Sequence, residues 1–406
     1  MSTKPSTIEQ SGASPLPPDE EEEVVVDIPV DPLLQLLYAR HTITSPVTTS
    51  EEREEARRFM VEEMRTHHMA PYIRMIQAAM GWDDFTEAEL AEMDKINAGK
   101  LEQWESKARD ATDNLGDVEV RDALQGKCDL YARIGDLDNF LQANDACSVK
   151  TLAAGPRMDL CFQRVRMGIA FSDNNIAAEG LQKAQKLMLS SDWERRNRLK
   201  VYEGVYYIFV RDFKKGSELL LESINTFASG ELLSFKDFVF VTIIASLPVL
   251  SRGELKKKII DSPEVLSADL DDAYGLLTAI YTCQYDKVFT QLDAVCQHQR
   301  RIVYVSPHVN YFFREVRVLV FTQFLDSYSS VTLKSMSEAF RIPTGLLDSM
   351  LSTFIFNERI TCKVDRINGS VQTYRGDATN FHYHKIIKSG DILINRIQKL
   401  SRLVDM

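Results

Sequence analysis

The sequence predicts a mainly α-helical fold: a solenoid of helix pairs of the tetratricopeptide type, followed by a winged-helix unit and one long C-terminal helix. Three observations predict this fold class. Proline, which breaks helices, is sparse, since only five of the thirteen prolines follow Pro71, and glycine is sparse too. A helix-turn pattern recurs with a period in the high thirties. Near the C-terminus, a helix–turn–helix pattern is followed by a hairpin signal.

Composition places the chain among globular proteins with more than one domain. Its 406 residues are 44 % hydrophobic and 26 % charged, which excludes a fibrous or wholly disordered protein. The longest apolar stretch, Val239–Leu250, is shorter than the roughly twenty residues of a membrane-spanning helix. The N-terminal residues lack the apolar core of a secretory signal. We therefore expect no signal and no membrane contact.

The cysteines and the net charge indicate the cellular compartment and the class of partner. The six cysteines are scattered and include no CxxC pair, so we expect reduced thiols in a protein of the cytoplasm and nucleus. The net charge of −11 would repel a phosphate backbone. This charge argues against a general nucleic-acid-binding protein.

The first segment is a polar tail. Residues 1–23 are rich in serine, threonine and proline and end in the acidic run Glu20–Glu23, a composition that cannot form a core. We expect this tail to be disordered. The apolar segment Val24–Tyr38 is interpreted as a short docking segment followed by one or two helical turns.

Helical patterns fill the rest of the N-terminal region, which we delimit as residues 24–114. Glu51–Met80 predicts two helices, the second with Pro71 in its first turn. Thr86 and Glu89 have the spacing of a capping box, so a longer helix is expected to begin there. Its apolar residues predict a stripe packed on a neighbouring helix, with an intermolecular coiled coil as the alternative. The stripe consists of Leu101, Trp104, Ala108, Ala111 and Leu115.

Residues 115–311 carry the repeat. Four times a helical pattern ends, a polar residue follows, and an apolar residue opens the next helix. The apolar residues recur at intervals of 39, 37 and 72, the last being twice 36, which indicates a solenoid with two helices per unit. Each pair must stack on its neighbours to bury its apolar face. The four junctions are Asp136-Leu137, Asn175-Ile176, Asp212-Phe213 and Gln284-Tyr285.

Residues 312–381 predict a winged helix. Its helix–turn–helix consists of Lys334–Phe340 and Gly345–Phe356, with Thr344 as the expected N-cap of the second helix. Asn368-Gly369 is a strong hairpin-turn signal. The two strands expected on either side of it are Ile360–Asp365 and Ser370–Tyr374.

Residues 382–406 close the chain with a helix from about Tyr383 to Val404. Its apolar residues are spaced 7, 4, 3 and 4 apart, which is a heptad seam. The winged helix is too small to bury the whole seam, so we expect a partner to cover it. The expected partner interface on this helix consists of Ile386, Leu393, Ile397, Leu400 and Val404.

Catalytic and ligand-binding motifs are missing from the sequence. It contains no GxxxxGK[ST] phosphate loop, no GxGxxG, no HExxH and no GxSxG. His382-Tyr-His384 comes nearest to a metal site, but a metal-dependent deubiquitinase of the JAMM type needs serine and aspartate where Ile392 and Asn395 stand. We expect no enzymatic activity, no cofactor and no metal ion.

The second helix of the winged helix would be the recognition helix of a DNA-binding protein. From Pro343 to Phe356 it contains Asp348 and no lysine or arginine. Base and phosphate contacts need such cationic side chains. We therefore expect this unit to contact protein and not nucleic acid.

A solenoid, a winged helix and a terminal helix in this order resemble the PCI-domain family, whose members are scaffolds of the proteasome lid, the signalosome and a translation-initiation factor. Several runs resemble the proteasome-lid members in particular, and the resemblance covers about residue 30 to the end. The most specific run is the ending, Gly390–Arg402. The other runs are Asp192–Tyr202, Arg211–Lys214, Asn114–Gly116 with Arg121–Ala123, and Ser330–Leu333 with Glu338–Phe340.

The resemblance implies a non-catalytic structural subunit of the 19S regulatory particle that supports ubiquitin-dependent protein degradation. It implies a hetero-oligomer with the other PCI subunits of the proteasome lid and with the lid deubiquitinase. In such an assembly winged helices join edge to edge, and the terminal helix enters a helical bundle. The hairpin would then supply an edge strand at the subunit boundary, with Val371, Gln372 and Tyr374 as interface residues.

The residues of the run Asp192–Tyr202 also predict a core position and ion pairs. Trp193 is expected in the core. The arginines 195, 196 and 198 are expected in ion pairs, either within the chain or between subunits. The acidic tail departs from the family pattern, so no role is transferred to it.

Two alternatives from the same family remain at this point. One is a signalosome-type scaffold. The other is an adaptor of the mRNA-export type, which would need a basic surface on the winged helix.

Overall fold

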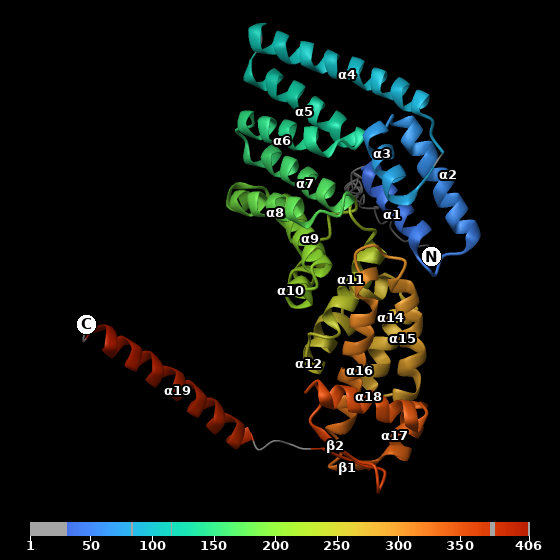
Figure 1. Ribbon diagram of the computed structural model, residues 1–406, viewed down its shortest axis with the longest axis vertical. Coiled ribbons are helices and arrows are strands. Elements are labelled where there is room, and N and C mark those ends of the chain that lie inside the picture. The colour runs from blue at the N-terminus through green and yellow to red at the C-terminus, as the bar shows by residue number, and fades with distance from the viewer. Residues whose placement is uncertain (1–30, 83, 115, 374–377, 405–406) are drawn as a thin grey trace, which may run out of the picture.

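The structure is a computed structural model that describes residues 31–82, 84–114, 116–373 and 378–404, with the side chains of the last segment from residue 382 on (Figure 1). The expected tail, the first part of the docking segment and Tyr374 lie outside the described residues. The fold is mainly helical, as predicted. An arc of stacked helices leads into a second helical body that ends in a small sheet, and the last helix stands apart.

The arc begins with four helices and continues with three antiparallel pairs. The four helices are α1 (Pro32–Thr44), α2 (Ser50–Thr66), α3 (Ala70–Met80) and α4 (Glu87–Asn114), of which α1 and α2 form a hairpin. The pairs are α5 (Asp117–Ile134) with α6 (Leu137–Lys150), α7 (Ala154–Ala170) with α8 (Asn174–Leu187), and α9 (Trp193–Phe209) with α10 (Phe213–Ser223).

The second body follows the arc. Its helices are α11 (Phe235–Ser246), α12 (Arg252–Leu255), α13 (Pro263–Ser267), α14 (Asp271–Thr282), α15 (Tyr285–Gln299) and α16 (Val309–Leu325). The winged helix consists of β1 (Ser330–Thr332), α17 (Leu333–Phe340), α18 (Thr344–Phe356), β2 (Cys362–Asp365) and β3 (Ser370–Thr373), and α19 (Ala378–Val404) comes last. Among the described residues, no helix has the length and apolarity that a membrane crossing requires.

The predicted helix starts in the N-terminal region are confirmed. Pro71 lies in the first turn of α3. At the start of α4, the Thr86 N–H donates to the Glu89 carboxylate at 2.9 Å, and the Glu89 N–H donates to the Thr86 hydroxyl at 3.4 Å, which is a capping box. The part of the stripe that lies in α4 packs on α5, where a methyl group added to Gly126 would lie 2.7 Å from the Trp104 ring, whereas Leu115 lies outside the described residues. This stripe therefore serves the chain's own fold.

The predicted repeat is confirmed, and the backbone explains its turns. In each of the three pairs of the arc, and in α14 with α15 of the second body, the first helix ends at a residue in the left-handed region, with φ between 59° and 80°. The next residue donates its N–H to the carbonyl five residues earlier, which closes a Schellman motif, and then acts as the N-cap of the second helix. The left-handed residues are Gly135, Ser172, Arg211 and Cys283.

One predicted junction is displaced. The sequence pattern places it at Asn175-Ile176, but α8 begins at Asn174 with Asp173 as its N-cap. The Asp173 carboxylate accepts the Asn175 N–H at 2.9 Å, so the helix begins two residues before the apolar residue. The other three junctions coincide with helix starts.

Helix α1 joins two hydrophobic cores. Leu33 and Leu36 belong to the core of the N-terminal helices, whereas Leu34 and Leu37 belong to the core that runs from α7 to the winged helix. A fully buried leucine contributes roughly 2 kcal/mol of hydrophobic free energy. Because both cores use α1, this helix ties the beginning of the chain to its middle.

A buried ionic cluster lies where the arc meets the second body. Glu231, between α10 and α11, is only 2 % exposed. Its carboxylate accepts from the guanidinium of Arg198 at 2.7 Å and from that of Arg166 at 3.3 Å. The Tyr202 hydroxyl donates to the same carboxylate, and Arg166 also pairs with Asp31 at the start of α1. Burial raises the pKa of Tyr202, so this hydroxyl stays protonated as a donor.

Two expectations for the run Asp192–Tyr202 have different outcomes. Trp193 is 63 % exposed, so its expected core position is wrong: it is the first residue of α9, before the helix reaches its packed part. Arg195 and Arg198 form ion pairs within the chain, with Asp159 and Glu231 respectively.

The winged helix has a three-stranded antiparallel sheet in the order β1-β3-β2. Asp365 pairs with Ser370, so the hairpin loop spans residues 366–369 and is longer than a two-residue turn. The Asp365 carboxylate accepts the N–H groups of Ile367 and Asn368 and so orders the loop, while Gly369 supplies a φ of 62°. Thr344 is the first residue of α18 and not its N-cap, which is Pro343.

The ionic cluster yields a stability prediction. Glu231→Gln keeps the shape of the side chain but leaves Arg166 and Arg198 without their shared buried carboxylate. We expect a loss of about 3 kcal/mol of unfolding free energy, as for the removal of one partner from a buried ion pair. Thermal and urea unfolding of the purified chain measure this loss.

The matched control is Glu222→Gln, which removes an exposed ion pair with Lys200 of 3.0 Å. Exposed pairs contribute at most about 1 kcal/mol. Equal unfolding curves for the two variants would contradict the role given to the cluster.

Candidate functional site

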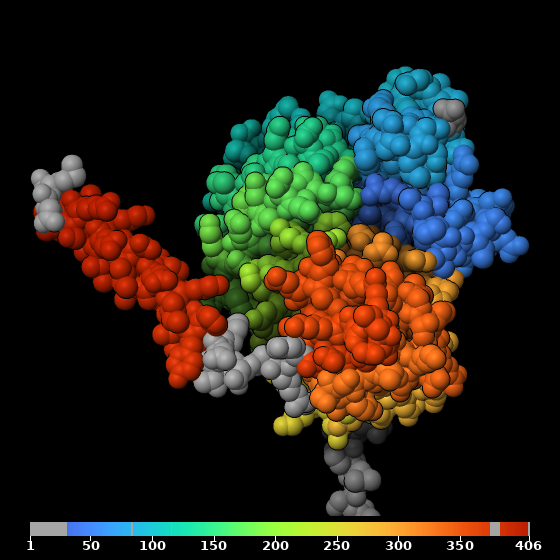
Figure 2. Space-filling model, turned by 60° about the horizontal axis from the view of Figure 1, so that its bottom comes forward, coloured from blue at the N-terminus to red at the C-terminus, as the bar shows by residue number. Residues whose placement is uncertain are grey.

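The terminal helix is the most exposed apolar element of the described chain. Its large apolar side chains are between 54 % and 77 % exposed, and α19 projects away from the rest of the molecule in both views (Figures 1 and 2). At 100° per residue most of them fall on one side of the helix. They are Tyr383, Ile386, Ile387, Ile392, Leu393, Ile394, Ile397, Leu400, Leu403 and Val404.

Basic residues flank this apolar stripe. Five cations against one acidic residue, Asp391, lie between residues 385 and 402. None of the five takes part in an ion pair within the described part of the chain. The helix therefore offers an apolar seam with a positive border to a partner. The cations are Lys385, Lys388, Arg396, Lys399 and Arg402.

The expected hairpin interface needs a correction. The strand with Val371 was expected at an edge of the sheet, but β3 lies between β1 and β2 and is paired on both sides. Val371 is fully buried in the chain's own core, whereas Gln372 is exposed. Tyr374 lies outside the described residues. Within the described residues, the outer strands of the sheet are β1 and β2, and their outward edges are unpaired. This order depends on the pairing of β1 with β3, two strands far apart in the sequence, which no local sequence signal predicts.

Helix α18 carries an uncharged outer face. Its exposed residues include Leu346, Ser349, Thr353 and Phe356, which recur with helical spacing. The Arg366 side chain from the hairpin reaches Asp348 at 3.0 Å and neutralises the acidic residue of this helix. This face is suited to a contact with protein more than to one with a phosphate backbone.

The cysteine and histidine side chains of the described residues do not form a catalytic or metal-binding group. The six cysteines are free, and burial raises the pKa of Cys128 to about 12 and of Cys296 to about 11, which disfavours a reactive thiolate. His382 and His384 lie in the first turns of α19. Within the residues that the structure describes, no three His, Cys, Asp or Glu side chains are grouped so as to hold a metal ion.

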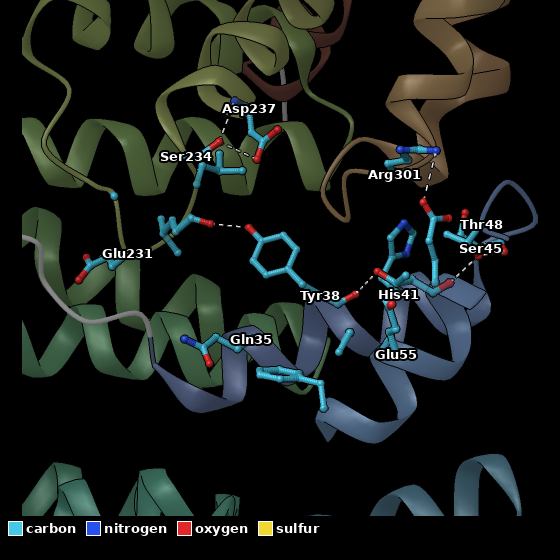
Figure 3. Close-up of a pocket in the computed structure, with 18 residues that line it drawn as sticks. Gln35, Tyr38, His41, Ser45, Thr48, Glu55, Glu231, Ser234, Asp237 and Arg301 are labelled. Atoms are coloured by element: carbon cyan, nitrogen blue, oxygen red, sulfur yellow. Dashed lines mark hydrogen bonds and ion pairs between the residues drawn. The ribbon is translucent and has the colours of Figure 1, made fainter. Parts of the chain in front are cut away.

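A groove that the sequence analysis missed lies between the α1–α2 hairpin and residues 230–237 (Figure 3). Its volume is about 790 Å³. Helix α1 lines it with residues 35, 38, 39 and 42, and α2 with residues 52, 55, 56 and 59. Each set follows one face of its helix, but most of these residues are polar and the opposite wall comes from almost two hundred residues later, so no local sequence pattern predicts the groove.

Comparison with known proteins gives a consistent result along the chain. Residues 86–258 match the family described as 26S proteasome subunit RPN7, and residues 289–375 match the PCI domain. Residues 382–404 match the family described as 26S proteasome regulatory subunit RPN7/PSMD6 C-terminal helix.

Curated relatives match over most of their length. The chain is 36 % identical to the 26S proteasome non-ATPase regulatory subunit 6 homolog of Arabidopsis thaliana, over 92 % of this chain and 97 % of the relative. It is 37 % identical to 26S proteasome non-ATPase regulatory subunit 6 of Dictyostelium discoideum, over 86 % and 91 %. It is 31 % identical to 26S proteasome regulatory subunit RPN7 of Saccharomyces cerevisiae, over 89 % and 91 %.

The central position of β3 yields a prediction. Gln372→Pro removes a ladder N–H from a strand that is paired on both sides, so it should destabilise the winged helix of the free chain itself. We expect proteolysis at the hairpin to become at least several-fold faster. The control Gln372→Thr keeps the N–H and should behave like the unchanged chain. If the proline variant resists protease as well as the control, the N–H of Gln372 does not take part in the sheet.

Proposed function

The chain belongs to the RPN7/PSMD6 family of proteasome regulatory subunits, which are PCI-domain subunits of the proteasome lid, and from this membership we propose that it acts as a non-catalytic scaffold. A subunit of this family works within a hetero-oligomeric proteasome complex. We propose that its direct partners are other PCI subunits of the lid and the lid deubiquitinase. The relatives do not favour a signalosome-type or mRNA-export scaffold.

The observation that carries the proposal is the uncovered stripe of α19. An exposed apolar stripe of this length marks an interaction site in a water-soluble assembly. A helix with a heptad seam is buried most readily in a bundle of other helices. We propose that α19 inserts into such a bundle, with Ile386, Leu393, Ile397, Leu400 and Val404 in its core and the basic border facing acidic neighbours.

We propose the winged helix as the second contact. The free edges of β1 and β2 present unpaired backbone groups, which a strand of a neighbouring subunit can pair with. In this arrangement Gln372 lies near the boundary, whereas Val371 holds the sheet on its own core. The six free cysteines fit the reducing cytoplasm and nucleus, which we propose as the location.

Assembly through α19 can be tested with Leu393→Asp combined with Leu400→Asp. Both side chains are exposed in the chain by itself, so the thermal melting of the free protein should not change. In the assembled lid each change places a charge in an apolar core, which costs several kcal/mol, on the order of 2–5 per site. We expect the double variant to be missing from reconstituted lid on a native gel.

The matched control is Asn395→Asp combined with Gln398→Asp, which adds the same charge to the side of α19 away from the seam. This control should assemble. Loss of soluble protein in the seam variant would show instead that α19 belongs to the chain's own core and would refute the assembly role.

The non-catalytic proposal predicts that the purified chain, free of other subunits, does not cleave ubiquitin chains. The reason is the missing catalytic constellation around His382 and His384. Incubation with and without a metal chelator, with complete lid as the positive control, measures this. Chelator-sensitive cleavage by the free chain would contradict the proposal, and His382→Ala would then locate the activity.

A further inference from the structure

The groove in Figure 3 has the form of a docking site for a helix. The two sets of residues from α1 and α2 place two neighbouring helix faces along one side of the groove. In helix-in-groove recognition, an amphipathic helix lays its apolar face into a groove between elements of the partner protein. Ala39, Ala56 and Tyr38 form apolar surface there, and the Phe59 ring is exposed beside them. A volume of about 790 Å³ is enough for several side chains of a partner.

The walls of the groove are fixed to each other. The Tyr38 hydroxyl donates to the Leu232 carbonyl across its floor. At one end, a ring nitrogen of His41 lies 2.9 Å from the Arg300 carbonyl, and the Ser45 hydroxyl donates to the same oxygen at 3.3 Å. Because these contacts join α1 to distant parts of the chain, the groove is formed before any partner arrives.

The charge of the groove is negative. Glu52 is matched by Arg301 at 3.8 Å, and Glu231 is neutralised by the arginines of the ionic cluster. Glu55 on the α2 wall and Asp237 on the opposite wall have no ion-pair partner among the described residues. Two uncompensated carboxylates thus face an apolar floor from two sides.

We propose that this groove binds a cationic amphipathic helix from another proteasome subunit, which inserts apolar side chains beside Phe59 and places lysine or arginine near Glu55 and Asp237. This proposal rests on the proposed scaffold function and adds a third contact to it. We infer a cationic partner because the carboxylates of Glu55 and Asp237 complement positively charged side chains. The chain's own N-terminal segment is a poor occupant because its Glu20–Glu23 run would face the same carboxylates.

The occupant can be identified by photo-cross-linking. Phe59→p-benzoylphenylalanine places a reactive ring in the groove of the full chain, which is then assembled with purified lid subunits and irradiated. We expect mass spectrometry to find the cross-link in a helical segment of another subunit with a net positive charge. A cross-link to an acidic segment, to the chain's own residues or to a second copy overturns the proposal, as does the absence of any cross-link in fully assembled lid.

Charge reversal tests the same contact without a cross-linker. Glu55→Lys combined with Asp237→Lys should weaken incorporation into the lid at least about tenfold, because like charges across an interface oppose binding. The matched control is Glu51→Lys with Glu54→Lys, which makes the same change on α2 outside the groove. Circular dichroism and thermal melting verify that both proteins fold.

The outcomes separate this inference from the scaffold function. If both variants assemble equally well, the groove is not the contact, and the scaffold function stands. If the unchanged chain fails to assemble with lid subunits, the scaffold function itself is refuted.

Discussion

The course of the chain depends on one buried carboxylate, that of Glu231. It accepts hydrogen bonds from three groups on α7 and α9 at the point where the arc of helices gives way to the second body. Through Arg166 the cluster also reaches Asp31, which precedes α1. A buried charge must be matched by opposite charge nearby, so these elements can meet only in an arrangement that brings both arginines to Glu231. The cluster thereby joins the solenoid to the second body, whose core continues into the winged helix.

The molecule has two main groups of apolar side chains, those buried in its own cores and those exposed on α19. Two cores joined by α1 bury the side chains that the fold needs, and the core of the second body continues into the winged helix as far as Val371. The stripe of α19 has no part in either core. Within the described residues, the body carries an uncovered helix and two unpaired sheet edges, which fits the role of a scaffold in a family of proteasome regulatory subunits.

Local patterns in the sequence were sufficient for the parts of this structure that local physics determines. The repeat could be predicted because three of the four polar junction residues, Asp136, Asp212 and Gln284, stand at the N-cap of a helix. The capping box at Thr86 and Glu89 could be predicted because its two bonds span three residues. The exposure of Trp193, the central place of β3 and the wall of the groove at residues 230–237 depend on contacts between distant segments. The left-handed backbone conformation of Ser172, Arg211 and Cys283 could not be predicted from the sequence either, since glycine is the usual signal for that conformation.

The central claim is that the chain folds by itself around the Glu231 cluster and keeps α19 for its partners. Amide hydrogen exchange, measured on the free chain and on the same chain within assembled lid, tests this claim most directly. Our account predicts strong protection of α7 and α9 in both states, and protection of residues 382–404 that rises by orders of magnitude only on assembly. The account is contradicted if α19 is already protected in the free chain, or if α7 and α9 gain their protection only in the complex.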